Sequence, residues 1–210
     1  MEGRPKKLPV IFYRTPAGTE PVREWLNGLP QEDRRILGHD IGTVEFGWPV
    51  GMPLCRSLGG GLWEVRSNLM RGRIARVIFC TAQGRMILLH GFVKKTQKTP
   101  QPDLELARKR QKGDRAMSDN PRFGSSFDDW LQEQGIYEEV KTQAVKRVLA
   151  WQIEQAMKAQ GISKVEMARR MGTSRAHLDR LLDPDNDKVQ LDTVQRAAAA
   201  VGRKLRLELA

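Results

Sequence analysis

The stretch that most constrains the fold of this chain runs from Leu88 to Pro100 and reads LLHGFVKKTQKTP. Its first half is a run of large apolar residues that suits a strand inside a core. Its second half holds three lysines, which are costly to bury without a compensating charge because they lose their hydration. The sequence therefore predicts a buried strand that brings a cationic cluster to a surface.

The first 112 residues predict a small α+β domain. Between Ile74 and Cys80 the chain is apolar at both odd and even positions, which is typical of a central strand covered on both faces. Short loops between neighbouring strands favour hairpins, so we expect an antiparallel sheet with helices on one face. The predicted elements are a strand over 8–14, a helix from Pro21, a helix over 31–46, strands over 53–58, 62–68, 73–80 and 86–93, and a helix over 102–112.

Residues 113–126 form a break rich in Gly, Ser, Asp, Asn and Pro, which predicts a linker. Met117 lies within this break and is followed by a polar stretch, as at the start of a separate protein. We therefore expect that two reading frames join near Met117. The sequence leaves open whether the join arose in nature or by design.

The last part, residues 127–210, predicts an all-α domain with a short terminal strand. A capping box of Ser163 and Glu166 opens one short helix, Gly172 follows it, and Ser174 opens the next. Two short helices joined by a tight glycine turn form a helix-turn-helix unit. The other predicted elements are a helix from 126, a long helix over 141–160, a helix over 191–201 and an alternating strand over 204–209.

The net charge of +11 is distributed unevenly along the chain. Residues 1–116 carry +10, residues 117–140 carry −5 and residues 141–210 carry +6. A basic domain suggests a polyanionic partner such as nucleic acid, and a surplus of charge that serves solubility is the alternative. The acidic segment between the two basic ones could mask the first.

Other features of the sequence exclude several classes of protein. No apolar run approaches the roughly 18 residues of a membrane span, and no apolar segment follows Lys6 and Lys7 as a secretory signal would require. Cys55 and Cys80 are isolated in apolar surroundings, which favours buried thiols over a disulfide or a metal site. We expect a cytoplasmic protein with no cofactor, no bound metal and no membrane partner.

Cationic residues of the predicted hairpins lie near one another if the strands pair in sequence order. Guanidinium and ammonium groups on a sheet suit the phosphates of RNA or DNA. RNA cleavage needs a base for the proton of a ribose 2′-hydroxyl, cations for the developing charge and an acid for the leaving oxygen. A lysine crowded by arginines can act as the base because its pKa falls. The candidate catalytic residues are Arg66, Arg73, Arg76, Lys94 and Lys95.

Four further residues beside this set are candidates for RNA binding: Arg56, His90, Phe92 and Lys98. A structural role is the alternative for His90. Phe92 belongs either to the core or to a platform that stacks on a base.

The strings LWEVRSN at 62–68, RIARVIF at 73–79 and LLHGFVKKTQKTP at 88–100 resemble the HigB-like, phage Gp49-type branch of the RelE/ParE toxin superfamily. The resemblance covers about residues 8–112. It implies a ribosome-dependent mRNA endonuclease that cleaves without metal and that uses the same five Arg and Lys residues. Some members use a C-terminal tyrosine or histidine, and residues 101–116 contain neither. Catalysis would then rest on the Arg and Lys residues, alone or with His90.

Residues 163–182 resemble the helix-turn-helix of Cro/repressor (XRE-type) proteins through Ala168, Gly172 and Leu178. The second helix would enter the major groove, where Arg175 could contact a guanine and discriminate by about 1–3 kcal/mol. A plain helical bundle is the alternative. The candidate DNA-binding residues, for bases or phosphates, are Ser163, Lys164, Ser174, Arg175, His177 and Arg180.

Residues 117–210 as a whole resemble a HigA-type antitoxin, and the resemblance implies that they bind the toxin and repress their own operon. We therefore expect a toxin–antitoxin pair in one chain, with homo-oligomers formed through the antitoxin. Whether the antitoxin covers the active site or blocks access to the ribosome stays open. The acidic segment 119–139 carries the apolar side chains that we expect to neutralise the toxin: Phe127, Trp130, Leu131, Ile136 and Tyr137.

Two other functions stay open at this point. The first domain could inhibit gyrase without cleaving RNA, as the ParE branch does. Alternatively, the whole chain could be a non-catalytic transcription regulator whose basic domain adds affinity for DNA.

Overall fold

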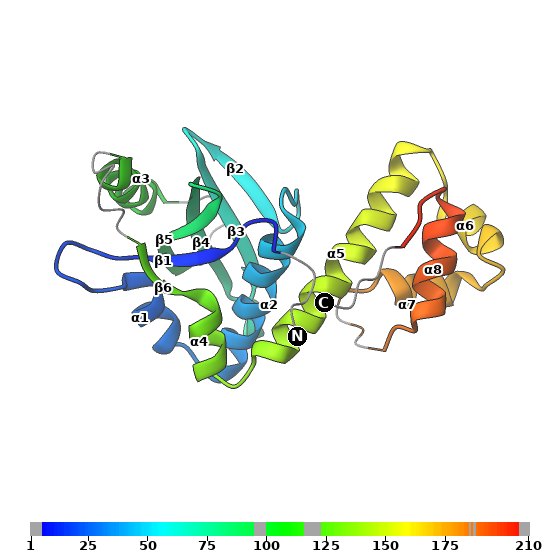
Figure 1. Ribbon diagram of the computed structural model, residues 1–210, viewed down its shortest axis with the longest axis horizontal. Coiled ribbons are helices and arrows are strands. Elements are labelled where there is room, and N and C mark those ends of the chain that lie inside the picture. The colour runs from blue at the N-terminus through cyan, green and yellow to red at the C-terminus, as the bar shows by residue number, and fades with distance from the viewer. Residues whose placement is uncertain (1–5, 95–99, 116–122, 185, 187, 206–210) are drawn as a thin grey trace. The chain divides into compact units, whose positions relative to one another are not determined.

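A computed structural model describes residues 6–94, 100–115, 123–184, 186 and 188–205. These residues form two compact units (Figure 1). The first, which we call the sheet unit, spans Lys6–Lys141, and the second, the helical unit, comprises the described residues from Thr142 on. Within these ranges no helix is long and apolar enough to cross a membrane.

The strands of the sheet unit form one six-stranded sheet in the order β2-β3-β4-β5-β1-β6. All neighbouring pairs are antiparallel except β1 and β5, which are parallel. The expected purely antiparallel sheet is wrong for this pair, because the long stretch of chain between β1 and β5 allows a return in the same direction. The strands are β1 (Val10–Tyr13), β2 (Cys55–Gly59), β3 (Leu62–Asn68), β4 (Ile74–Ala82), β5 (Arg85–Lys94) and β6 (Phe123–Ser126).

Helices cover both faces of this sheet (Figure 1). Along β4, Val77 and Phe79 pack on one face, whereas Ile78 and Cys80 pack on the other. The predicted central strand is confirmed, but the expected restriction of the helices to one face is wrong. We name each face after one of its helices. The α2 face is covered by α1 (Pro21–Asn27), α2 (Gln31–Gly47) and α4 (Phe127–Glu133), and the α3 face by α3 (Gln101–Arg115).

Residues 123–126, predicted as the end of a linker, form β6 beside β1. A Cβ atom at Gly124 would lie 2.4 Å from Oε1 of Glu20 and 2.8 Å from the carbonyl oxygen of Phe12. The small residues that suggest a linker are therefore required for a close approach to the sheet. Helix α3 also extends beyond its predicted end to Arg115. The rest of the predicted linker, residues 116–122, lies outside the described residues.

The boundary between the two compact units lies after Lys141, not in the predicted linker. Helix α4 and the start of α5 (Tyr137–Ala159) belong to the sheet unit, because Phe127, Trp130 and Val140 are at most 1 % exposed in its core. Composition cannot show this, since an amphipathic helix looks the same whichever core it fills. The functional division into toxin and antitoxin stays a prediction.

The helical unit packs the rest of α5 and three further helices around a second core. The predicted caps are confirmed: Oγ of Ser163 accepts a hydrogen bond from the backbone N–H of Glu166, and Oγ of Ser174 accepts one from His177, both at 3.2 Å. The strand predicted over 204–209 lies mostly outside the described residues. The three helices are α6 (Lys164–Arg170), α7 (Arg175–Leu182) and α8 (Leu191–Ala200).

Candidate functional site

Cationic side chains from four strands meet on the α3 face of the sheet. The strand register places Arg66 of β3 opposite Arg76 of β4, and Arg56 of β2 opposite Glu64 of β3. Lys94 ends β5 opposite Ile74, which shares its face with Arg76 because side chains alternate along a strand. We call Arg56, Arg66, Arg76 and Lys94, with Glu64 among them, the cationic cluster.

Glu64 lies between two guanidinium groups of the cationic cluster. Its Oε1 is 3.8 Å from Nε of Arg76 and 3.9 Å from Nε of Arg66. Arg76 is only 2 % exposed, and its Nη1 also donates to the carbonyl oxygen of Ala75 at 2.7 Å. The carboxylate of Glu64 balances only part of the cationic charge, so the cluster keeps a positive surplus that suits a phosphate group.

Burial and crowding lower the pKa of Lys94. Desolvation is the largest cause, the three arginines of the cluster add to it, and Glu64 opposes them. Desolvation also lowers the pKa of Arg76, with Arg66 acting in the same direction and Glu64 against it. Because a lysine in such surroundings has a larger neutral fraction than an exposed one, Lys94 is chemically suited to act as a base.

Arg73 is not part of the cationic cluster, although we predicted it as a catalytic residue. Its Nη2 lies 2.7 Å from Oδ2 and 2.9 Å from Oδ1 of Asp33, a buried residue of α2. Alternation explains this position, because Arg73 shares its face with Val77 while Arg76 lies on the α3 face. Arg73 holds α2 on the sheet, and a catalytic role is at odds with its position.

His90 and Phe92 lie on the α3 face beside the cationic cluster. Phe92 is opposite Arg76, and its ring stacks on His90 with 5.4 Å between the centroids. Nε2 of His90 lies 2.8 Å from Oδ1 of Asp103 in α3. Sequence reasoning missed Asp103, because only the docking of α3 on the sheet brings this carboxylate to the strand. Two other predicted members of the site, Lys95 and Lys98, lie outside the described residues.

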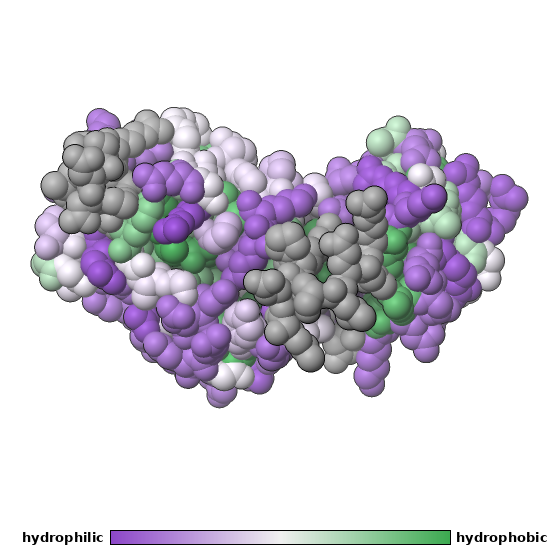
Figure 2. Space-filling view, viewed as in Figure 1, coloured by the Kyte–Doolittle hydropathy of each residue, from purple (hydrophilic) through white to green (hydrophobic). Residues whose placement is uncertain are grey.

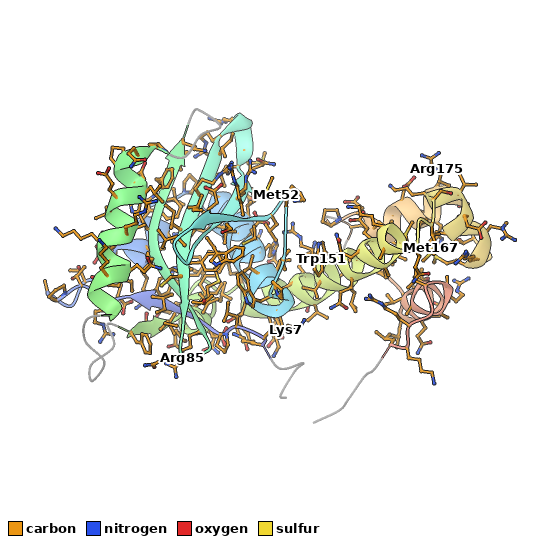
Figure 3. The ribbon with its side chains drawn as sticks, turned by 90° about the horizontal axis from the view of Figure 1, so that it is seen from above. Lys7, Met52, Arg85, Trp151, Met167 and Arg175 are labelled. Atoms are coloured by element: carbon orange, nitrogen blue, oxygen red, sulfur yellow. The ribbon has the colours of Figure 1, made fainter. Side chains whose placement is uncertain are left out.

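Met52 is another neighbour of the cluster that sequence reasoning missed. Its Sδ lies 3.1 Å from Nη1 of Arg66, and the residue is 55 % exposed in the loop before β2 (Figure 3). A polarizable thioether beside a guanidinium group offers an apolar contact next to a phosphate-binding charge. No local sequence signal marks Met52, since it lies in a loop and its partner Arg66 lies on strand β3.

The predicted toxin-neutralising residues lie in the sheet-unit core on the α2 face. The rings of Phe127 and Trp130 stack with 5.4 Å between centroids, and Phe127 lies 6.1 Å from the ring of Phe12. The indole N–H of Trp130 donates to Oδ1 of Asn27 at 2.8 Å. This half of the predicted set therefore contacts β1 and the end of α1.

The other half of that set packs against α2. A Cβ atom at Gly38 would lie 3.4 Å from the side chain of Leu131 and 3.5 Å from that of Ile136. Tyr137 is partly buried against the same core. Gly38 thus leaves the space that lets residues 123–141, which we call the docking segment, approach α2 closely.

Charged groups also fix the docking segment. Glu20 accepts hydrogen bonds from the backbone N–H of Ser125 at 2.7 Å and from its hydroxyl at 2.6 Å. Burial opposes ionisation of Glu20, but these bonds and Arg14 lower its pKa. Nη2 of Arg23 lies 2.6 Å from both carboxylate oxygens of Glu133. Strong charge-assisted bonds therefore hold both ends of α4 near α1.

The docking segment does not mask the cationic cluster with its acids. Its ion pairs join Asp128 to Lys6, Glu133 to Arg23, and Glu139 to Arg35 and His39. None of these pairs, within the described part of the chain, reaches the α3 face. The acidic segment meets basic residues, as expected, but on the face opposite the cluster.

The predicted DNA-binding residues gather around α6 and α7 of the helical unit. Nζ of Lys164 lies 2.7 Å from Oδ1 of Asp179, and Nε of Arg175 lies 3.8 Å from its Oδ2. Arg175 projects from the surface of the unit (Figure 3). His177 and Arg180 line one pocket. Hydrophilic residues are spread over the face of this unit that Figure 2 shows.

Comparison with known proteins bears on the sheet unit. No curated protein matches the chain. Residues 24–112, less than half of the chain, match the family model described as phage-derived protein Gp49-like (DUF891). The match contains the whole cationic cluster and ends within α3, before the docking segment. This part of the sheet unit is therefore similar to the Gp49-like proteins, a RelE/HigB-like family of toxins from toxin–antitoxin systems.

Proposed function

We propose that the sheet unit is a ribosome-dependent mRNA endonuclease with its catalytic centre at the cationic cluster. The observation that carries the proposal is Lys94, a buried lysine with a lowered pKa that shares a sheet face with Arg66 and Arg76. The similarity of residues 24–112 to a toxin family supports a toxic activity for the same residues. Arg56, Phe92 and Met52 would hold the RNA beside them.

The proposed reaction uses the lysine and arginine side chains of the cationic cluster and no metal. Neutral Lys94 takes the proton of a ribose 2′-hydroxyl, the 2′-oxygen attacks the adjacent phosphorus, and the bond from phosphorus to the 5′-oxygen breaks. A positioned base contributes about 10²–10⁴-fold to the rate. Arg66 and Arg76 stabilise the charge on the phosphate, at about 10²–10³-fold for each donor. The products are a 2′,3′-cyclic phosphate and a 5′-oxygen that becomes a hydroxyl once an acid gives it a proton.

The same proposal assigns neutralisation to the docking segment and operator binding to the helical unit. The position of the segment on the α2 face supports blocked access to the ribosome rather than coverage of the cluster. The capped helices α6 and α7 support a helix-turn-helix, with Arg175 exposed for a base contact. The proposal also includes homo-oligomers formed through the helical unit, and the molar mass of the full chain in solution tests this part.

Expression of residues 1–116 without the rest of the chain tests the nuclease. We expect growth arrest with cleavage of translated mRNA, and no arrest by the full chain. Lys94→Ala should abolish both effects, because the base is lost. Lys109→Ala, an exposed lysine of α3, is the matched control and should leave both effects intact.

Two other outcomes would redirect the assignment. Arrest with DNA damage and intact mRNA would indicate gyrase inhibition. Because residues 123–141 contribute to the core of the sheet unit, the absence of arrest would favour a non-catalytic regulator only for a 1–116 fragment that circular dichroism shows to be folded. For the helical unit, Arg175→Ala should abolish operator binding while the chain still neutralises the toxin. Arg196→Ala on α8 is the control and should keep operator binding.

A further inference from the structure

A histidine and a carboxylate form a pair beside the cationic cluster that the reaction described so far does not use. His90 of β5 and Asp103 of α3 meet with 2.8 Å between Nε2 and Oδ1. Their side chains are 17 % and 26 % exposed, so the pair is sheltered yet accessible to a ligand. Among the described residues, no other polar group bonds to the His90 ring.

The sheet register fixes the place of this ring. His90 lies opposite Ile78 and Phe92 lies opposite Arg76, so the imidazole is two residue pairs along the sheet, on the same face, from a guanidinium of the cluster. The ring of Phe92 stacks on the imidazole at an angle of 24°. Asp103 therefore holds one edge of the imidazole, and Phe92 covers one of its faces.

The pair is not needed to attach α3 to the sheet. Nη1 of Arg110 donates to the carbonyl oxygen of Leu89 at 2.6 Å, and the side-chain amide of Gln111 donates to Gly60 at 3.1 Å. Ala107 is fully buried against the same face. Because a partly exposed ion pair adds little to stability, orientation of an acid–base group accounts for the His90–Asp103 pair better than anchoring does.

A carboxylate that is hydrogen-bonded to one imidazole nitrogen determines which ring nitrogen exchanges a proton with a ligand. When Nε2–H donates to Asp103, Nδ1 is the nitrogen that gains or loses a proton, and the carboxylate stabilises the imidazolium. The charged groups that share this face include the cations Arg56, Arg66, Arg76 and Lys94 of the sheet, Arg110 of α3 and one anion of the sheet, Glu64, so that cations outnumber it. They favour transfer of a proton away from the ring toward an anion.

We propose that His90 is the general acid of the reaction and that Asp103 is its positioning residue. This inference rests on the proposed function. As the bond from phosphorus to the 5′-oxygen breaks, the His90 imidazolium gives its Nδ1 proton to that oxygen and becomes neutral. Lys94 keeps the proton taken from the 2′-hydroxyl, so protons and charge balance. A positioned acid contributes about 10²–10⁴-fold to the rate.

The chain has three histidines, which makes a direct test on the full chain practical. Chain labelled with ¹⁵N-histidine gives three imidazole patterns in an NMR spectrum, and His39→Gln and His177→Gln assign them. The probe is a short single-stranded RNA with a 2′-O-methyl group on every ribose, which cannot be cleaved because the attacking hydroxyl is blocked. Fluorescence anisotropy of the same RNA measures its affinity.

We expect the RNA to shift the His90 signals and to keep His90 doubly protonated to higher pH than in the free chain. Nδ1–H would then donate to the anionic linkage. Asp103→Asn, which keeps the shape of the side chain, should bind the RNA within about threefold of the parent affinity and lose this response. Glu105→Gln on the exposed side of α3 is the control and should retain it.

Each contrary outcome has a distinct meaning. If the RNA binds through Lys94 but leaves the His90 signals unchanged, His90 is not the acid. If Asp103→Asn responds to RNA as the parent does, Asp103 does not position the ring. If the chain fails to bind the RNA at any accessible salt concentration, the cationic cluster is not an RNA site, and the proposed function falls together with this inference.

Discussion

Glu45 of α2 is a buried acid whose surroundings make the stability of the sheet unit depend on pH. It is 1 % exposed, lies 3.0 Å from Nζ of Lys6 and accepts the backbone N–H of Val10 at 2.9 Å. Burial raises its pKa from 4.5 to about 7, although Lys6 and the hydrogen bond oppose the shift. A raised pKa in the folded state means that the carboxyl stabilises the fold most while it is protonated.

The contribution of Glu45 is therefore fully present below pH 4.5 and is lost as the pH rises through about 7. We expect the free energy of unfolding to fall by up to about 3 kcal/mol between pH 5 and 8. Glu45→Gln should remove most of this slope, and Glu24→Gln, an exposed acid of α1, should keep it. Urea unfolding at several pH values measures the slope, and an equal slope for Glu45→Gln and the parent would contradict the assignment.

At the scale of elements, β6 is the part of the docking segment that extends the sheet. Its register pairs Ser126 with Ile11 and Phe123 with Tyr13, and Glu20 closes over Ser125. This arrangement leaves no room for a side chain at Gly124. A backbone that must come this close to its neighbours is sensitive to a single methyl group.

Gly124→Ala should therefore detach β6 from β1. We expect faster hydrogen exchange of the amides of 123–126 and a loss of stability of about 1–3 kcal/mol from overpacking. Gly51→Ala is the control, because Gly51 has negative φ and no atom within 4 Å of an added Cβ. Unchanged exchange in Gly124→Ala would show that β6 is not held as described.

At the scale of the whole molecule, the chain has separate cores in its two compact units. Leu88 of β5 and Leu178 of α7 are both fully buried, one in each unit. Removing either side chain leaves a cavity that costs about 2–5 kcal/mol. Because the cores do not share these residues, each loss should stay within its own unit.

We expect calorimetry of the full chain to show two unfolding transitions. Leu88→Ala should lower the melting temperature of one transition, and Leu178→Ala that of the other. The two variants serve as controls for each other, since they remove the same atoms. A single transition that both variants shift equally would mean that the units unfold as one.

Local patterns in the sequence were sufficient for most of the elements. Such patterns depend on neighbours within a few residues, so they can be recognised without knowledge of the fold. Examples are the alternation in β3, the two-sided apolar run in β4 and the caps at Ser163 and Ser174. Arg66, Arg76 and Lys94 could be grouped because hairpins pair adjacent strands. Asp103 and Met52 could not be added to this group. Each contacts a strand from another element, and the sequence does not show where that helix or loop packs.

The sequence by itself determined the α+β character of the first part, the helical character of the last part and the cations that strand β5 and its hairpin partners carry. Only the tertiary structure decided that Arg73 lies on the α2 face, that residues 123–141 complete the first core and that Asp103 meets His90. The reason is physical. Hydrogen bonding and periodicity act along a few residues, whereas the face a side chain occupies and the core a helix fills are settled by burial against distant parts of the chain.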